Sequence, residues 1–309
     1  MAEDLTLNVI VPTAITDSIL FSSTAVENDY AAYNPATTYA LGDRVISTTT
    51  HRVYESGQNG NLGKDPTNIV SRTGTPPWWI DVGPTNKWAM FDGYINTATT
   101  VATPLTVVLR PGFIGALYLS GLVAEQCDIT IKDAPGGTVV LTHSESLESS
   151  QPPDYWEYFF MPFRQQDDLL LTGIPPYANM KITITLSSTS GNVSCGFLSA
   201  GDLRPLGMTE FDAEAQPKSY SYIGEDNYGN TKIIQRPSAK NMRLSAEVDI
   251  ENADFAEETI RQLQDAPAVW IGVDLANYAG LRVVGLGSGP LVYKNARQCF
   301  LNLTVKGFI

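Results

Sequence analysis

Charged residues are scarce in this chain. They make up only 17% of its 309 residues, against about 25% in an average soluble domain. Lys and Arg total 20 against 33 acidic residues, which is too few basic residues for a nucleic-acid-binding surface. No segment reaches the ~20 apolar residues that a membrane-spanning helix needs, and the acidic start, Met1 to Asp4, lacks the basic beginning of a signal peptide. We therefore expect neither a nucleic-acid partner nor a membrane span.

Cysteine and histidine are equally sparse. Cys127, Cys195 and Cys299 lie far apart without CxxC spacing, so the sequence predicts buried thiols and neither a disulfide framework nor a zinc site. The two histidines, His51 and His143, stand among Thr or Ser without a nearby Cys or a paired acid. A histidine metal site or a hydrolase triad would need such partners. The sequence therefore predicts no enzymatic activity, no metal and no cofactor.

Apolar residues and turn formers are what the chain has in quantity. It is 43% hydrophobic and contains 25 Gly and 19 Pro, which excludes a disordered chain and a helical bundle and predicts a mainly β protein. Strand-length patterns recur at the spacing typical of β-sandwiches. The expected organisation is an N-terminal strand segment (1–30), a small aromatic β domain (31–86), a jelly-roll-like β-sandwich (87–201) and a strand-rich α+β assembly domain with one helix (202–309).

Alternation and turn residues also predict individual elements. In the small domain we expect strands at Arg44–Ser47 and Arg52–Glu55. In the sandwich we expect strands at Trp88–Ile95, Leu105–Leu109, Ala116–Leu122, Asp128–Lys132, Thr138–Thr142, Trp156–Met161, Asp168–Thr172, Met180–Leu186 and Ser194–Leu198. The C-terminal stretch predicts a hairpin of Ser219–Ile223 with Thr231–Arg236, strands at Leu244–Ile250, Ala268–Val273, Gly280–Gly285 and Phe300–Lys306, and a helix at Ala253–Gln264 capped by Asn252 with an apolar stripe of Phe255, Ile260 and Leu263.

Charge is distributed unevenly along the chain. Residues 1–30 hold five acids and no base, whereas residues 201–309 hold 11 of the 20 Lys and Arg. Such asymmetry is compatible with head-to-tail self-assembly or with docking on a neighbouring protein. An ordinary solvated surface is the alternative.

Residues 33–82 resemble the small chitin-binding type-3 (family 5/12) carbohydrate-binding modules. The matching residues are Tyr33, the run 39–45 (Tyr-Ala-Leu-Gly-Asp-Arg-Val), Val53, Tyr54, Pro66, Trp78 and Trp79. The resemblance implies that flat rings stack on the apolar faces of a sugar, with Tyr54, Trp78 and Trp79 as the carbohydrate-binding residues. The loop 55–77 departs from the pattern by its length. One or both Trp residues would equally form the core of the domain or pack against the next one.

A second resemblance covers more of the chain. The segment 79–92, the segments 236–240 and 267–272, and the closing run 301–309 are similar to parts of tail and baseplate proteins of tailed bacteriophages. The resemblance implies a virion structural protein of the tail tip or baseplate, made in the host cytoplasm. Its expected partners are other tail proteins, further copies of itself, and glycans of the host surface. The alternative is a dedicated glycan-binding adhesin or receptor-binding protein.

Overall fold

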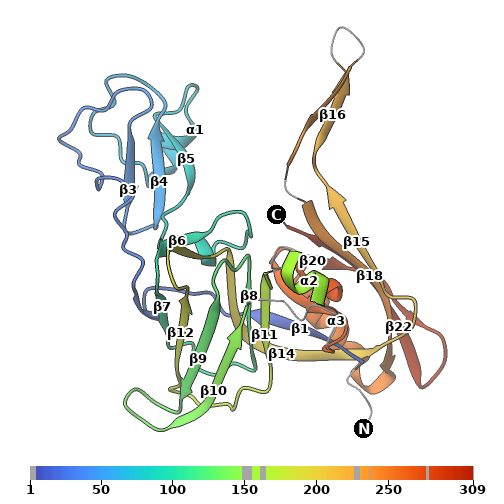
Figure 1. Cartoon of the computed structure of the whole chain (residues 1–309). Coiled ribbons are helices and arrows are strands. Elements are labelled where there is room, and N and C mark those ends of the chain that lie inside the picture. The colour runs from blue at the N-terminus through green and yellow to red at the C-terminus, as the bar shows by residue number, and fades with distance from the viewer. Residues whose placement is uncertain are drawn as a thin grey trace.

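The computed structural model describes residues 5–147, 155–160, 165–225, 230–236, 238–275 and 278–308, without the side chains of residues 157 and 158. This part of the chain is mainly β, as the sequence predicts, and its strands form two large and three small antiparallel sheets (Figure 1). The helical elements are short. They are α1 (Ile69–Thr73), α2 (Tyr155–Phe160), α3 (Ala253–Gln262) and the 3₁₀ turns Ala89–Phe91, Ile250–Asn252 and Ala279–Leu281.

The middle of the chain is a two-layer β-sandwich. One layer is the sheet with the order β10 (Val139–Ser146), β9 (Gln126–Lys132), β12 (Lys181–Ser187), β7 (Leu105–Leu109) and β2 (Leu20–Ser23). Buried and half-buried residues alternate strictly along β9 and β12, because successive side chains of a strand point to opposite faces. Their buried residues, such as Ile129 and Ile184, share one core with Leu117 and Leu119 of the opposite layer.

The second large sheet continues from the sandwich into the C-terminal part. Its order is β11 (Asp168–Leu171), β8 (Ala116–Ser120), β14 (Phe197–Thr209), β1 (Thr6–Pro12), β19 (Ala268–Ile271), β20 (Arg282–Ser288), β22 (Gln298–Gly307), β18 (Ser238–Asp249) and β15 (Glu214–Ser219), with β21 (Leu291–Tyr293) beside β22. β14 also pairs with β18, so the strands from β14 to β18 close into a barrel. Helix α3 buries Ala256 and Ile260 in the same core as Trp270 of β19.

The long strand β14 joins these two bodies. Its first residues pair with β8 in the sandwich, and its later residues pair with β1 in the barrel. The expected boundary at 201/202 therefore falls inside one continuous strand. The N-terminal segment is divided in the same way, because β1 lies in the barrel wall and β2 lies at the edge of the sandwich sheet.

Two of the expected strands are wrong. The stretch Trp88–Ile95 forms a 3₁₀ turn that begins after Trp88 and buries Met90 in the sandwich core. The stretch Trp156–Met161 is helical over α2, and Met161 lies outside the described residues. Both are short apolar runs without alternation, in which periodicity cannot tell a strand from a helical turn.

Smaller differences concern element ends. The stretch expected as the strand Ser194–Leu198 is divided between β13 (Asn192–Cys195), which pairs with β6 (Thr99–Ala102), and β14. Helix α3 begins after Asn252, as predicted, but the Asn252 side chain makes no capping hydrogen bond. Phe255, expected in the apolar stripe, is 45% exposed and lies under the Arg204 guanidinium.

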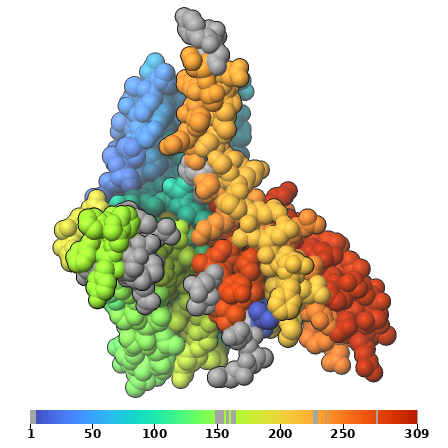
Figure 2. Space-filling view, turned by 45° about the vertical axis from the view of Figure 1, so that its right-hand side comes forward, coloured from blue at the N-terminus to red at the C-terminus, as the bar shows by residue number. Residues whose placement is uncertain are grey.

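Two small sheets extend away from the main body. The small aromatic domain contains β3 (Arg44–Ser47), β4 (Arg52–Ser56) and β5 (Trp79–Pro84), and the predicted hairpin consists of β16 (Tyr222–Glu225) and β17 (Thr231–Ile234). Figures 1 and 2 show both projecting from the same side of the molecule. The small aromatic domain and the hairpin therefore both extend beyond the main body on this side.

Candidate functional site

Two of the three aromatic residues expected to bind sugar form the core of the small domain. Tyr54 is 1% exposed and Trp79 is 0% exposed, and both pack with Tyr39 and Val45. The ring of Trp79 meets that of Tyr39 edge-on with centroids 5.2 Å apart, and its Nε1 donates a hydrogen bond to the carbonyl of Lys64 over 2.7 Å. A sugar stacks on an exposed ring face. The core alternative that the sequence left open therefore applies to Trp79, and Tyr54 is a core residue as well.

Trp78 is in a different position. It stands next to the inward-facing Trp79, is half-buried, and has the Lys64 ammonium 5.5 Å from its ring centroid. Its backbone is fixed, because Trp78 N donates to Ser71 O over 2.9 Å and its carbonyl accepts from Asn61 Nδ2 over 3.0 Å. Among the three expected residues, only Trp78 can offer part of its ring to a sugar.

His51 lies in a cluster that its sequence neighbourhood did not reveal. Its Nδ1 is 3.0 Å from Glu27 Oε1 and its Nε2 is 3.1 Å from Asp17 Oδ2. Its ring stacks on Trp88 at a centroid distance of 4.0 Å, and Thr85 Oγ1 also donates to Glu27 over 3.0 Å. The prediction that His51 has no paired acid is therefore wrong. Both ring nitrogens face a carboxylate, and the ring contact with Trp88, a residue of the sandwich core, joins the small domain to the sandwich.

The hairpin β16–β17 carries apolar side chains on both of its faces. Tyr222 lies opposite Ile234 and Ile223 lies opposite Ile233. Neighbouring pairs of a ladder point to opposite faces, so one apolar pair is on each face. The four residues are 43–69% exposed, and no third strand pairs with the hairpin within the part of the chain that the structure describes. We call residues 222–225 and 231–234 the apolar ribbon.

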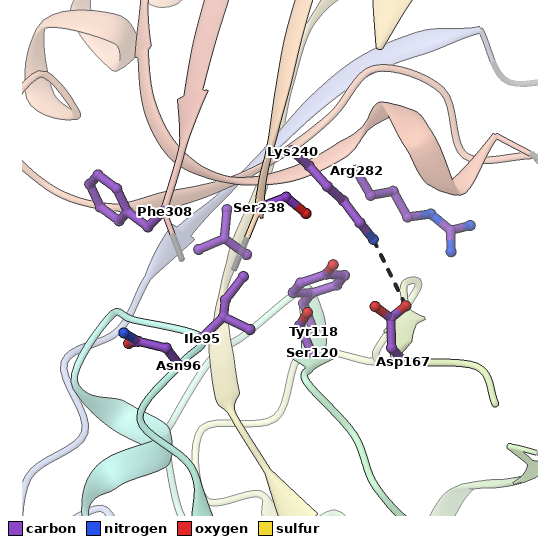
Figure 3. Close-up of a pocket in the computed structure, with 10 residues that line it drawn as sticks. Ile95, Asn96, Tyr118, Ser120, Asp167, Ser238, Lys240, Arg282 and Phe308 are labelled. Atoms are coloured by element: carbon purple, nitrogen blue, oxygen red, sulfur yellow. Dashed lines mark ion pairs between the residues drawn. The ribbon is translucent and has the colours of Figure 1, made fainter. Parts of the chain in front are cut away.

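A pocket lies at the seam between the sandwich and the barrel (Figure 3). Its volume is about 370 Å³. The sandwich side contributes the polar residues Asn96, Ser120 and Asp167, and the barrel side contributes Ser238, Lys240 and Arg282. Lys240 Nζ and Asp167 Oδ1 face each other across the pocket at 3.8 Å. We call this hollow the seam pocket; no sequence spacing could indicate it, because its residues come from six separate segments.

Burial shifts the pKa of the acid Asp168 and of two thiols. Burial raises the pKa of Asp168, next to the seam pocket, although Lys240 and Arg282 oppose the shift. Burial also raises the pKa of Cys127 and that of Cys195 to about 12. These thiols are buried and free, as predicted, and a thiol held in its neutral form is a poor nucleophile.

The sequence also predicts the absence of a metal site and of a membrane-spanning helix. Within the described residues, no group of three or more His, Cys, Asp or Glu side chains is arranged to hold a metal ion. No helix in this part of the chain has the length and apolar character needed to cross a membrane.

Comparison with known proteins gives little. No protein-family model matches the chain, and no curated protein matches it. Among solved structures, the F5/8 type C domain of a Bacteroides fragilis protein aligns with a TM-score of 0.25 and 16% sequence identity. The alignment covers 38% of this chain and 80% of that domain. A TM-score this low carries no argument about function.

Proposed function

We propose that the protein is a structural component of a multi-copy assembly, namely a tail tip or baseplate protein of a tailed bacteriophage. The observation that carries the assembly function is the apolar ribbon. An isolated two-stranded hairpin is only marginally stable in water, and exposed apolar patches mark interaction surfaces. Because the ribbon has one apolar pair on each face, neighbouring subunits would stabilise it most by burying both faces.

The charges of the described residues favour other copies of the chain as these neighbours. Lys218, Lys232 and Arg236 lie on or beside the ribbon and are exposed, whereas the N-terminal segment carries the exposed Asp17 and Asp29. Charges of opposite sign at the two places would orient one subunit on the next. The assignment to a phage tail depends on the resemblance of residues 79–92 and of the closing run 301–309 to tail proteins.

Light scattering and negative-stain microscopy of the purified protein test the assembly function. We expect defined oligomers or rings, and we expect Ile223→Lys with Ile233→Lys to convert them into monomers by placing charges on one face of the ribbon. Val139→Lys is the matched control, because Val139 is 53% exposed on β10, away from the ribbon. A wild-type protein that stays monomeric at all concentrations would contradict the proposal.

A glycan-binding adhesin is the second candidate, and Trp78 is the observation that favours it. The half-buried ring beside Lys64 provides one stacking surface with a hydrogen-bond donor close by. A sugar that stacks on a single aromatic ring binds weakly, and the presence of many copies of the protein in one assembly strengthens the binding through avidity. A glycan array with Trp78→Ala tests this function. Trp156→Ala, which removes a 62% exposed ring from α2, is the control.

A further inference from the structure

We propose that the seam pocket binds a neutral hexose residue of a glycan. This site is separate from Trp78, since it lies between the sandwich and the barrel, and it does not depend on the assembly function. The inference is drawn from three features of the pocket. They are its apolar wall, the mixture of polar groups at its rim, and the contacts that fix Tyr118 and Arg282 on their strands.

The apolar wall suits the C–H face of a pyranose ring. Ile95 from the sandwich side and Phe308 from the barrel side line the pocket with half-buried side chains (Figure 3), and the almost completely buried Tyr118 and Val284 complete its apolar lining. Sugar rings present an apolar face of C–H groups, which packs against aromatic and aliphatic side chains. The volume of about 370 Å³ is at the lower end of the range for small-molecule sites, ~300–1,000 Å³. A site of this size and lining fits a single sugar residue better than a large cofactor.

The polar rim combines groups that only donate with groups that only accept. Lys240 and Arg282 donate, an ionised Asp167 accepts, and the amide of Asn96 and the hydroxyl of Ser238 do both. A sugar hydroxyl also donates and accepts, so adjacent hydroxyls satisfy a rim of this kind. Lys240 is paired with Asp167, and Arg282 lies between Asp168 and Asp274, so the rim leaves no unbalanced charge to attract an ionic ligand. The rim therefore favours an uncharged polyol.

The groups at the mouth are free to change partners. Lys240 and Asp167 are 3.8 Å apart, with side chains 47% and 63% exposed. An exposed ion pair of this kind contributes little to stability. Both side chains can therefore turn onto ligand hydroxyls without a large loss in the folded protein.

The inner groups are held in place. Arg282 Nη2 is 3.2 Å from Asp274 Oδ1, and Arg282 Nη1 is 3.8 Å from Asp168 Oδ2. The hydroxyl of Tyr118 donates to the same Asp168 oxygen over 3.4 Å. Sites built on strands and fixed by such contacts lose little entropy when a ligand binds.

Titration of the full chain with single sugars tests the proposal. The probes are glucose, galactose, mannose and N-acetylglucosamine, with glucuronic acid and N-acetylneuraminic acid as charged counterparts, followed by saturation-transfer NMR and calorimetry. We expect at least one neutral sugar to bind with a Kd on the order of millimolar, and the charged sugars to bind more weakly. Absence of binding by every neutral sugar, or binding of the acidic sugars alone, would overturn the proposal.

Variants locate the binding and separate it from other functions. Asn96→Ala and Lys240→Ala change exposed residues, so the fold should survive, and each should weaken binding about tenfold through the loss of one hydrogen-bonding group. Lys232→Ala, on the apolar ribbon, and Trp78→Ala should leave the affinity unchanged. Binding that disappears in Trp78→Ala but persists in the two pocket variants would move the sugar to the small domain and refute the seam site. Failure of assembly would have no bearing on this result.

Discussion

The small aromatic domain and the apolar ribbon use similar side chains in opposite ways. In the small domain, Trp79 and Tyr54 are almost completely buried, whereas Ile223 and Ile233 of the ribbon are 69% and 60% exposed. Both regions are formed by short strands that project from the same side of the molecule (Figure 1). The difference lies in what covers the strands. A third strand and the residues between β4 and β5 surround the aromatic core, and nothing comparable surrounds the ribbon within the described chain.

This contrast shows how apolar residues indicate function. A ring in a small domain is most often the means by which that domain folds, because so short a chain can bury little else. An apolar side chain left in water on a projecting hairpin contributes nothing to the fold of its own subunit, and is more informative about a partner. The clearest functional signal is therefore in the ribbon rather than in the aromatic domain.

The largest effect is expected for Trp79→Ala. Removing a fully buried Trp leaves a cavity and should cost about 3–5 kcal/mol, which exceeds what so small a core can lose. The small domain should unfold while the sandwich and barrel remain folded, and hydrogen exchange of β3 to β5 would measure this directly. Trp78→Ala is the comparison variant; its ring is half-buried against the same core, so a smaller loss of about 1–2 kcal/mol is expected. Equal losses in the two variants would remove the distinction between the fully buried and the half-buried ring.

A smaller effect is expected for His51→Asn. His51 has a φ of 55°, which Asn tolerates better than most residues, so the substitution removes the ring contacts with little change in backbone strain. Loss of the hydrogen bonds to Asp17 and Glu27 and of the Trp88 contact should cost about 1–2 kcal/mol. We expect faster proteolysis between residues 13 and 30 while the core of the small domain stays intact. Unchanged proteolysis would show that the cluster does not hold the domain to the sandwich.

Much of the fold could be predicted from alternation. β3, β7 and β9 lie close to their predicted ranges, and along β9 buried and half-buried residues alternate because one face of that strand is buried. The misassigned stretches, Trp88–Ile95 and Trp156–Met161, are short and mostly apolar, without the alternation that distinguishes a strand from a helical turn. The closure of the barrel could not be predicted from the sequence either. It depends on β14 pairing with β18 as well as with β1, and such long-range pairings leave no local trace.

The candidate sites were less predictable than the fold. Tyr54, Trp78 and Trp79 are aromatic residues of one small domain, and nothing in their sequence neighbourhood distinguishes the fully buried Tyr54 and Trp79 from the half-buried Trp78. The partners of His51 lie 24 and 34 residues away, so no motif joins them. The exposure of Ile223 and Ile233 was likewise hidden, because an apolar residue in a predicted strand is ordinarily assumed to be buried.

The buried carboxyl group of Asp168 provides a test of how burial of a charge affects stability at different pH values. Its pKa is raised by burial, so the folded state holds the proton more tightly than the unfolded state does. The resulting stability is fully present below the unfolded pKa and is lost as pH rises through the folded pKa. Asp168→Asn should therefore be relatively more stable than wild type at neutral pH, and this advantage should shrink on acidification. Denaturant unfolding at several pH values checks it. A constant difference across pH would mean that Arg282 and Lys240 compensate for burial.

The smallest effect on subunit stability is expected for substitutions in the apolar ribbon. This prediction gives the strongest contrast between the ribbon and the small aromatic domain. Ile223→Thr and Ile233→Thr keep a β-branched side chain, so strand propensity is retained and only apolar area is lost. Because that area is already in water, the free energy of unfolding of the dilute monomer should change by less than about 0.5 kcal/mol. The oligomer should nevertheless become weaker, since each variant removes surface that a neighbour would bury. Measuring unfolding at low and at high protein concentration distinguishes the two contributions. A loss of stability that is independent of concentration would show that these side chains support the fold of their own subunit, as Trp79 does.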